Sequence, residues 1–378
     1  MAGFALQKAE IHVCRITEKT KWIFISLQDE DGVTGYGEAT LSGKEQQVCA
    51  LFTRHARDYL QAGGATPEAC FPHLNDLATA ALASGLDQAL WDLKAKRQQK
   101  PLYALIAENC SAEISVYANI NRKTAGRTAQ EFASNAVRAL NDGHRAIKIA
   151  PFDEVNCHDA NGQHFRQSVA AGLDRIACVR DAIGPDTRLM VDCHWRFDFA
   201  AAAELLQLTQ KYQLYWLECP IPETAQNSAA INRLRTQANE QGVLLAGCEE
   251  YIRLESFQPY LQADCYDIYM PDAKYVGGIQ EMLRVAAAVS DAGAVFSPHN
   301  PSGPICDAVS SHLCAAQQNA GMLEMQYDES PLFTALTDAP PKKIFNGVMA
   351  LPTLPGHGVN LNDSQLKRYA IHADIQRI

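Results

Sequence analysis

The chain has 378 residues, of which 47% are hydrophobic and 20% charged, the proportions of an ordinary globular protein. This length is too great for one small core and predicts two or three domains, or one barrel with an accessory domain. The formal net charge of −10 argues against a nucleic acid partner. It would also repel an anionic substrate, so a metal ion or local Lys and Arg residues must create any positive site.

The twelve cysteines are scattered without a CxxC pair, and the N-terminus shows no signal-peptide pattern. Reduced thiols in a cytoplasmic protein are the simplest interpretation. Because no apolar stretch is long enough to span a bilayer, we expect no membrane partner.

The first part of the chain predicts an α+β domain over residues 1–112. Residues 21–39 have the pattern of a β-hairpin that turns at Asp31-Gly32. A helical stretch follows through the fifties. Residues 79–96 also have helical apolar spacing, with small residues on one face that permit close packing.

From residue 113 the chain alternates between strands and helices, with helical stretches such as 170–182 and 278–292 between most of the strands. A TIM barrel contains eight strands, so we predict a modified TIM-type (β/α)7β barrel over residues 113–335. The strands are expected at residues 114–120, 145–151, 188–194, 214–221, 243–250, 266–272, 294–299 and 322–326.

Two further segments stand out. Residues 151–167 make a long polar connection after the second strand, which favours a substrate loop or a lid over disorder. Residues 336–378 contain the Pro- and Gly-rich run LPTLPGHGVNL, and we expect this segment to return to the N-terminal domain and complete it.

Three carboxylates each close a short apolar run: Asp192, Glu218 and Glu249. They are 26 and 31 positions apart, which fits one strand, one helix and two loops. Consecutive units of a parallel barrel place their strand ends around one mouth, so these carboxylates should converge there. Oxygen ligation of this kind suits Mg²⁺. The alternative is that acidic residues end strands only because the chain re-enters water, which explains one such residue more easily than three in succession.

Three cysteines adjoin the predicted ligands and raise the alternative of a zinc site: Cys193, Cys219 and Cys248. Neighbouring residues on a strand point to opposite faces, so these thiols should lie outside the barrel, against the helices. We therefore interpret them as small buried hydrophobic residues.

Reactive groups lie on five strands, namely Lys148, His194, Asp272, His299 and Glu324. Together with a metal ion they suit abstraction of a proton next to a carboxylate, because the resulting enediolate carries two negative charges. The cation and Lys148 would stabilise that charge. His299 would accept the proton, with Asp272 holding its tautomer and raising its basicity, and His194 would protonate a departing hydroxyl.

With these residues in place, the chain resembles the enolase superfamily nearly from end to end, specifically its mandelate racemase subgroup. The resemblance rests on the ligand series Asp192, Glu218 and Glu249, on MPDAKYVGG with Asp272, on SPHNPSGPI with His299, on LEMQ with Glu324, and on DGVTGYGEA and GLDQALWDLKAK, which resemble the capping-domain and early-barrel signatures. Within the subgroup, the Asp-x-His pair, the His-x-Pro-x-Gly-Pro run and the short connection before WIFISL are most similar to D-galactonate dehydratases and related sugar-acid dehydratases.

This resemblance implies an Mg²⁺-dependent hydro-lyase whose substrate is a sugar acid, either an aldonate or an aldarate. His299 with Asp272 would be the base and His194 the acid, and the product would be a 2-keto-3-deoxy sugar acid. The two histidines exchange roles if the substrate has the opposite configuration at C2. The choice of Glu249 rather than Glu250 as the third ligand also rests on the resemblance.

We also expect Glu324, Trp195 and Asn119 to contact the substrate, and the chain to form a homo-oligomer between a dimer and an octamer. Two departures from the family leave the substrate open. Racemases have Lys-x-Lys on the second strand, whereas in this chain Lys148 is followed by Ile149 and Ala150. Galactonate dehydratase has a glycine where Trp195 stands.

Two alternatives remain beside the dehydratase. One is an epimerase or cycloisomerase on the same scaffold, with His194 as an acid on the opposite face of the substrate. The other is an inactive barrel that serves as a binding or regulatory protein. The second would require a missing ligand or base, and the sequence supplies them all.

Overall fold

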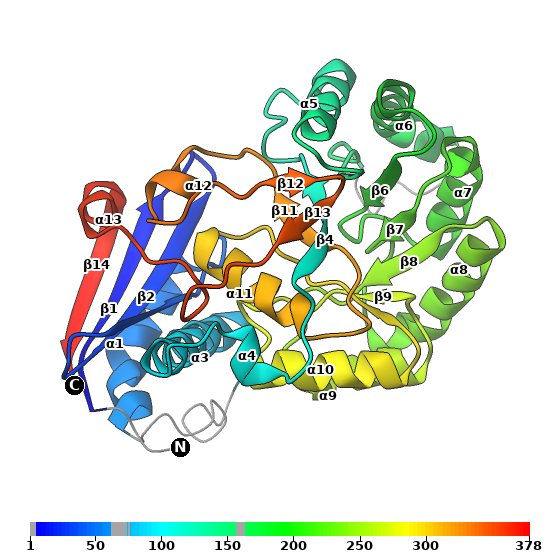
Figure 1. Ribbon diagram of the computed structural model, residues 1–378. Coiled ribbons are helices and arrows are strands. Elements are labelled where there is room, and N and C mark those ends of the chain that lie inside the picture. Colours follow the sequence, from blue (N-terminus) through cyan, green and yellow to red (C-terminus); the bar gives the residue numbers. More distant parts are fainter. Residues whose placement is uncertain (1–4, 62–73, 75, 156–162) are drawn as a thin grey trace.

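A computed structural model describes residues 5–61, 74, 76–155 and 163–378, and it places a small α+β domain beside a larger α/β domain (Figure 1). The small domain contains an antiparallel four-stranded sheet in the order β14-β1-β2-β3. Its strands are β1 (Leu6–Arg15), β2 (Lys21–Asp29), β3 (Thr34–Glu38) and, from the far end of the chain, β14 (Ala370–Arg377). The pair β2 and β3 confirms the predicted hairpin.

Two helices cover one face of this sheet, α1 (Glu45–Gln61) and α3 (Leu77–Arg97). Helix α3 confirms the helix predicted over residues 79–96, and the Asp76 carboxylate caps it by accepting from the N–H groups of its first turn. A Cβ added to Gly37 would lie 1.9 Å from the carbonyl oxygen of Gly85. Helix α3 therefore lies directly on β3, which only its small residues permit.

All eight predicted barrel strands are present and parallel, in the ladder order β11-β4-β5-β6-β7-β8-β9-β10. An isolated parallel bridge joins Phe296 of β10 to Ala320, and Ser297 Oγ donates to the Met322 carbonyl, so the first and last strands of this order approach each other. The strands are β4 (Glu113–Asn119), β5 (Ala146–Ile149), β6 (Arg188–Asp192), β7 (Trp216–Glu218), β8 (Leu244–Gly247), β9 (Ile268–Tyr269), β10 (Val295–Phe296) and β11 (Leu323–Gln326).

Helices between these strands lie along the outside of the sheet (Figure 1). They are α5 (Ala129–Asn141), α6 (Gln163–Ile183), α7 (Phe199–Thr209), α8 (Ser228–Glu240), α9 (Arg253–Gln262), α10 (Ile279–Asp291) and α11 (Pro304–Ala315). Shorter elements are α4 (Tyr103–Ile106), η1 (Gln210–Tyr212), η2 (Ala225–Asn227), α12 (Leu332–Ala335) and α13 (Asp363–Tyr369). Within the described part of the chain, no helix is long and apolar enough to cross a membrane.

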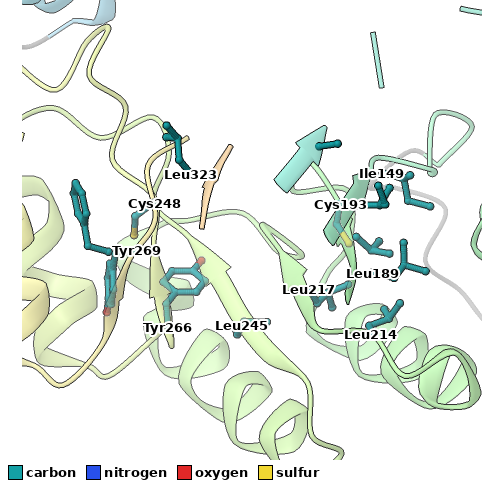
Figure 2. Close-up of a cluster of buried hydrophobic side chains, with 14 of the residues drawn as sticks. Ile149, Leu189, Cys193, Leu214, Leu217, Leu245, Cys248, Tyr266, Tyr269 and Leu323 are labelled. Carbon is teal, nitrogen blue, oxygen red and sulfur yellow. The ribbon is translucent and has the colours of Figure 1, made fainter. Parts of the chain in front are cut away.

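The strands separate two apolar layers. Met190 and Trp216 belong to a cluster inside the ring of strands, whereas their neighbours Leu189 and Leu217 pack outward against the helices. Figure 2 shows part of this outer layer, with Leu189 and Leu217 labelled on adjoining strands. Because side chains alternate along a strand, the residue that follows an outward-facing one at a strand end points into the barrel mouth.

The segment after β5 differs from the prediction. Helix α6 begins at Gln163, so the prediction that the polar connection runs to residue 167 was wrong. Phe165 and Val169 are buried four positions apart in the outer layer, and this helical spacing extends the helix toward its N-terminus. Residues 156–162 of the predicted loop lie outside the described residues.

The C-terminal segment pairs with the barrel before it reaches the small domain. Strands β12 (Ile344–Phe345) and β13 (Val348–Ala350) form a hairpin, and β13 runs antiparallel to β4, a pairing that the prediction did not include. The chain then crosses to the small domain, where β14 pairs with β1. This return of the tail confirms the predicted completion of the small domain.

The two domains are joined by polar side chains of the small domain that bind the loops after β9 and β10. Glu38 accepts hydrogen bonds from Gly303 N (2.8 Å) and Cys306 N (3.0 Å) at the start of α11. Asp87 accepts from Ile279 N (2.7 Å), and Gln88 Nε2 donates to the Ala273 carbonyl (2.9 Å). The small domain thus holds the loops that follow the sixth and seventh barrel strands.

Candidate active site

Three buried carboxylates lie at adjacent strand ends, as the sequence predicted. Asp192 ends β6 and is in register with Glu218 at the end of β7, while Glu249 lies two residues beyond β8. All three side chains are buried, whereas Glu250 is exposed. The buried position of Glu249 supports the choice of this residue over Glu250 at the third place.

The backbone around these carboxylates adopts an unusual conformation. His194, Trp195, Cys219 and Cys248 all have positive φ angles, between 44° and 68°, although none is a glycine. Left-handed backbone is costly for residues with a Cβ and gathers at functional sites, where the surrounding structure holds it in place. The strand ends of β6, β7 and β8 therefore carry backbone strain of the kind found at functional sites.

The carboxylates repel one another in this buried position. Burial raises the pKa of Glu218 to about 8, even though Lys148 lowers it. Burial also raises the pKa of Glu249 well above its usual value, and the charges of Asp192 and Glu218 raise it further. Burial alone would raise the pKa of Asp192, but His194 and Lys148 lower it to about 2. Ionising all three carboxyl groups would therefore place more negative charge here than the cations of the site balance.

The donor set fits a hard divalent cation. As the described side chains stand, no three acidic, histidine or cysteine groups form a ready metal-binding cluster. Glu218 and Asp192 instead hold Lys148 and His194, whereas Glu249 Oε2 is buried without a hydrogen-bond partner among the described residues. A buried carboxylate oxygen without a donor, beside two like charges, is the environment that a bound Mg²⁺ ion would neutralise.

The neighbouring cysteines do not suit a zinc site. Cys193 and Cys248 are fully buried in the outer apolar layer, as predicted from strand alternation (Figure 2). Burial raises the pKa of Cys193, Cys219 and Cys248 well above that of an ordinary thiol. Since zinc binds the thiolate, protonated thiols that face away from the mouth are poor ligands.

Lys148 connects two carboxylates inside the mouth. Its Nζ lies 2.6 Å from Glu218 Oε1 and 2.9 Å from Glu324 Oε1, and the side chain is buried. Glu324 also accepts from Asn119 Nδ2 (2.6 Å) and from Asn300 N (2.8 Å). The predicted residues Lys148, Glu324 and Asn119 therefore form one connected polar group beside the metal-ligand candidates.

The predicted pair of Asp272 and His299 is in contact. Asp272 Oδ2 lies 2.7 Å from His299 Nδ1, and on the other side of the ring Nε2 lies 3.7 Å from Glu249 Oε2. A carboxylate on Nδ1 holds the imidazole with Nε2 directed toward the carboxylate cluster. The structure thus brings His299 to one side of that cluster.

His194 lies at the other side of the cluster and faces a cavity. Its Nε2 is 2.8 Å from Asp192 Oδ2, and 47% of its side chain is exposed. The cavity has a volume of about 710 Å³ and lies between the two domains. Polar and charged residues of both domains line it beside His194, among them Lys19, Thr20, Lys21, Arg122 and Arg127.

Sequence reasoning missed three residues at this site. Lys274 Nζ contacts Asp272 Oδ2 at 2.6 Å, the same oxygen that His299 contacts, and Tyr275 Oη lies 3.3 Å from His299 Nδ1. Both residues belong to the motif MPDAKYVGG, so their nearness to Asp272 was the available signal. Glu223 lies in a loop after β7 and accepts a hydrogen bond from Cys248 N, 25 positions further along the chain, and no motif in the sequence indicated this contact.

Residues 6–107 match the family model for the mandelate racemase / muconate lactonizing enzyme N-terminal domain, and residues 131–365 match the enolase C-terminal domain-like model. The chain belongs to the mandelate racemase / muconate lactonizing enzyme family of the enolase superfamily. This confirms the predicted family and its fold, a barrel-type α/β domain with a capping domain.

Relatives of this enolase-superfamily chain include two named dehydratases. It is 28% identical to a D-gluconate dehydratase from Thermoproteus tenax, with 92% of this chain and 69% of the relative covered. It is 26% identical to a D-galactonate dehydratase from Ralstonia nicotianae, with 91% and 90% covered. Names of this kind support the predicted enzyme class, a hydro-lyase.

Solved structures show the same fold. A member of the enolase superfamily from Salmonella Typhimurium superposes with a TM-score of 0.84 at 21% identity, covering 98% of this chain and 99% of the other. A structure described as an enolase from the Sargasso Sea environmental genome superposes with a TM-score of 0.87 at 18% identity, covering 100% and 99%.

Proposed function

We propose that this protein is an Mg²⁺-dependent sugar-acid dehydratase that converts an aldonate or aldarate into a 2-keto-3-deoxy sugar acid. The observation that carries the proposal is the position of two histidines on opposite sides of one carboxylate cluster. His299 contacts Glu249 at one side and His194 contacts Asp192 at the other. A β-elimination needs this arrangement of one base and one acid around a charge-stabilising centre.

Asp192, Glu218 and Glu249 would hold the metal ion, which when bound supplies positive charge to the substrate carboxylate. His299 would take the α-proton on Nε2, because Asp272 occupies the side of Nδ1. The electron pair left on carbon moves into the carboxylate, and Lys148 stabilises the charge that develops there.

His194 would complete the elimination. As the enediolate returns its electron pair, the bond from C3 to the hydroxyl breaks and His194 donates the proton that turns the leaving group into water. The enol that remains becomes the 2-keto-3-deoxy acid. The exposed position of His194 beside the interdomain cavity leaves room for a substrate hydroxyl at this point.

One observation keeps an isomerase as a second candidate. His194 contacts the Asp192 end of the cluster and His299 the Glu249 end, and on this route His194 would return a proton to the opposite face of the same carbon. Ala150 is buried where a racemase of the family would have its second lysine, so this route would depend on His194 alone. A lactone or anhydro-sugar acid would be the substrate of a cycloisomerase of this kind.

A library of aldonates and aldarates, incubated with the protein and Mg²⁺, tests the proposal. Semicarbazide detects the 2-keto acid product through the absorbance of its semicarbazone. We expect one sugar acid, or a few that share the configuration at C2 and C3, to give product. If NMR shows epimerised or lactone product and no semicarbazone forms, the isomerase is correct. If no acid reacts and none exchanges its α-proton with solvent, the proposal is wrong.

A further inference from the structure

Glu223 is a buried carboxylate that the proposed reaction does not use. It lies in the loop after β7, five residues beyond Glu218, and reaches across to the end of β8. Its Oε1 accepts hydrogen bonds from Cys248 N (2.7 Å) and from the Tyr266 hydroxyl (2.8 Å). Burial raises the pKa of Glu223 to about 7, and hydrogen bonds from Cys248 N, the Tyr266 hydroxyl and the Trp195 side chain, whose donor is the indole N–H, lower it.

These contacts join three neighbouring strand ends. Trp195 follows the acid candidate His194 after β6, Glu223 itself follows β7, and Cys248 directly precedes Glu249 after β8. Trp195 and Cys248 both have left-handed backbone, with φ of 56° and 68°. Strained backbone of this kind persists only where other contacts hold it, and Glu223 binds both residues.

The absence of a side chain at Gly247 leaves the space that this carboxylate occupies. A Cβ added to Gly247 would lie 2.4 Å from Glu223 Oε1 and 2.5 Å from the Tyr266 ring. Glycine at position 247 is therefore required for the close approach of Glu223, because any larger residue would push the carboxylate away from Cys248.

We propose that Glu223 is a positioning residue that fixes the Trp195 indole and the backbone leading to Glu249, and so sets how the substrate meets the carboxylate cluster. The inference rests on the proposed function. The hydrogen bond from the indole leaves Trp195 one orientation beside His194. The bond to Cys248 N fixes the peptide from which the Glu249 side chain extends.

The test uses the full-length protein without substrate, in which the indole N–H signals of its four tryptophans are observed by ¹H–¹⁵N NMR. Trp195→Phe assigns the Trp195 signal. Trp216, whose Nε1 donates to Glu218 at 3.0 Å, gives an internal reference on the neighbouring strand. We expect Glu223→Gln to shift the Trp195 signal and leave the Trp216 signal unchanged, because Gln replaces one carboxyl oxygen by an amide NH₂ group but keeps the size of the side chain.

Two further variants separate positioning from general packing. Gly247→Ala should shift the same Trp195 signal, since it displaces the Glu223 carboxylate without changing its chemistry. Tyr266→Phe removes one hydroxyl donor to Glu223 but keeps the ring and the Glu223 carboxyl group, and should leave the Trp195 signal in place. An unshifted Trp195 signal in Glu223→Gln overturns the inference, and so does an equal shift in Tyr266→Phe.

Kinetics on the best substrate complete the test. Loss of the hydrogen bonds that this buried carboxyl group accepts predicts that Glu223→Gln and Gly247→Ala lower kcat/KM by about 10–100-fold, while Tyr266→Phe stays within about threefold of the wild type. Unchanged kcat/KM in both Glu223→Gln and Gly247→Ala overturns the inference. A failure of the proposed function is distinguishable, because the wild-type protein would then turn over no sugar acid while the indole signals still report on Glu223.

Discussion

Buried carboxylates occur in two regions of this protein, and their hydrogen-bond donors differ. In the capping domain, Asp92 accepts from Tyr36 N (2.9 Å) and His357 N (2.9 Å) as well as from Lys96. Glu38 likewise accepts from two backbone N–H groups at the start of α11. Backbone donors are fixed in place, so these carboxylates fasten one chain segment to another.

Two carboxylates of the barrel mouth are held in a different way. Glu218 is bound by the side chains of Lys148 and Trp216, and Glu249 Oε2 has no hydrogen-bond partner among the described residues. Side chains can exchange partners when a ligand enters, whereas backbone groups cannot. The comparison separates Asp92 and Glu38, whose backbone donors fasten chain segments together, from Glu218 and Glu249, whose donors are side chains or are missing, as a ligand site requires. Asp192 combines both features, because it accepts from His194 N and also contacts the His194 side chain.

Metal removal should have the largest effect on the barrel mouth. EDTA should abolish turnover and Mg²⁺ should restore it, because the enediolate loses its main stabilising charge. Glu249→Gln should abolish turnover as well. The matched control is Glu250→Gln, an exposed neighbour that should have a far milder effect. Full activity in metal-free protein would contradict the site, and the reverse order of the two variants would move the third ligand to Glu250.

The two histidines should affect different steps. His299→Asn should stop both turnover and exchange of the α-proton in D₂O, since no base takes the proton. His194→Asn should stop turnover and leave exchange intact, because only the leaving hydroxyl lacks its acid. Proton NMR in D₂O measures exchange directly. Exchange that survives in His299→Asn and is lost in His194→Asn would show that the two roles are reversed.

Lys148→Met should be the next largest change. Removing one preorganised cation from the developing charge predicts a fall in kcat on the order of 10²–10³-fold at saturating Mg²⁺. The alternative is that Lys148 only neutralises Glu218 and Glu324, which it contacts in the structure. In that case excess Mg²⁺ would recover most of the rate and thermal stability would fall, so kcat at saturating Mg²⁺ decides between them.

Asp92→Asn should change stability alone, with the smallest effect on the reaction. The amide nitrogen of Asn faces donors and leaves at least one of them unpaired, so unfolding free energy should fall by about 1–3 kcal/mol. Urea unfolding followed by tryptophan fluorescence measures this loss. Since Asp92 holds the tail to α3, kcat at 25 °C should stay within about twofold. A large loss of kcat with unchanged stability would break the distinction between the two regions.

Much of this protein follows from its sequence. The spacing of apolar runs predicted all eight barrel strands, and carboxylates ending three successive runs predicted that Asp192, Glu218 and Glu249 would meet. Both predictions depend on repeating patterns, which short-range periodicity and parallel topology convert directly into positions in space. The roles of the site residues stay predictions until they are tested.

Tertiary structure alone decided the contacts between segments with no shared pattern. The lysine at position 274 shares the Asp272 oxygen with His299, and Glu223 binds Trp195 and Cys248 from a third strand end. The pairing of β13 with β4 joins residues more than two hundred positions apart. Such contacts depend on where long side chains and loops lie once the barrel has formed, and sequence periodicity does not specify those positions.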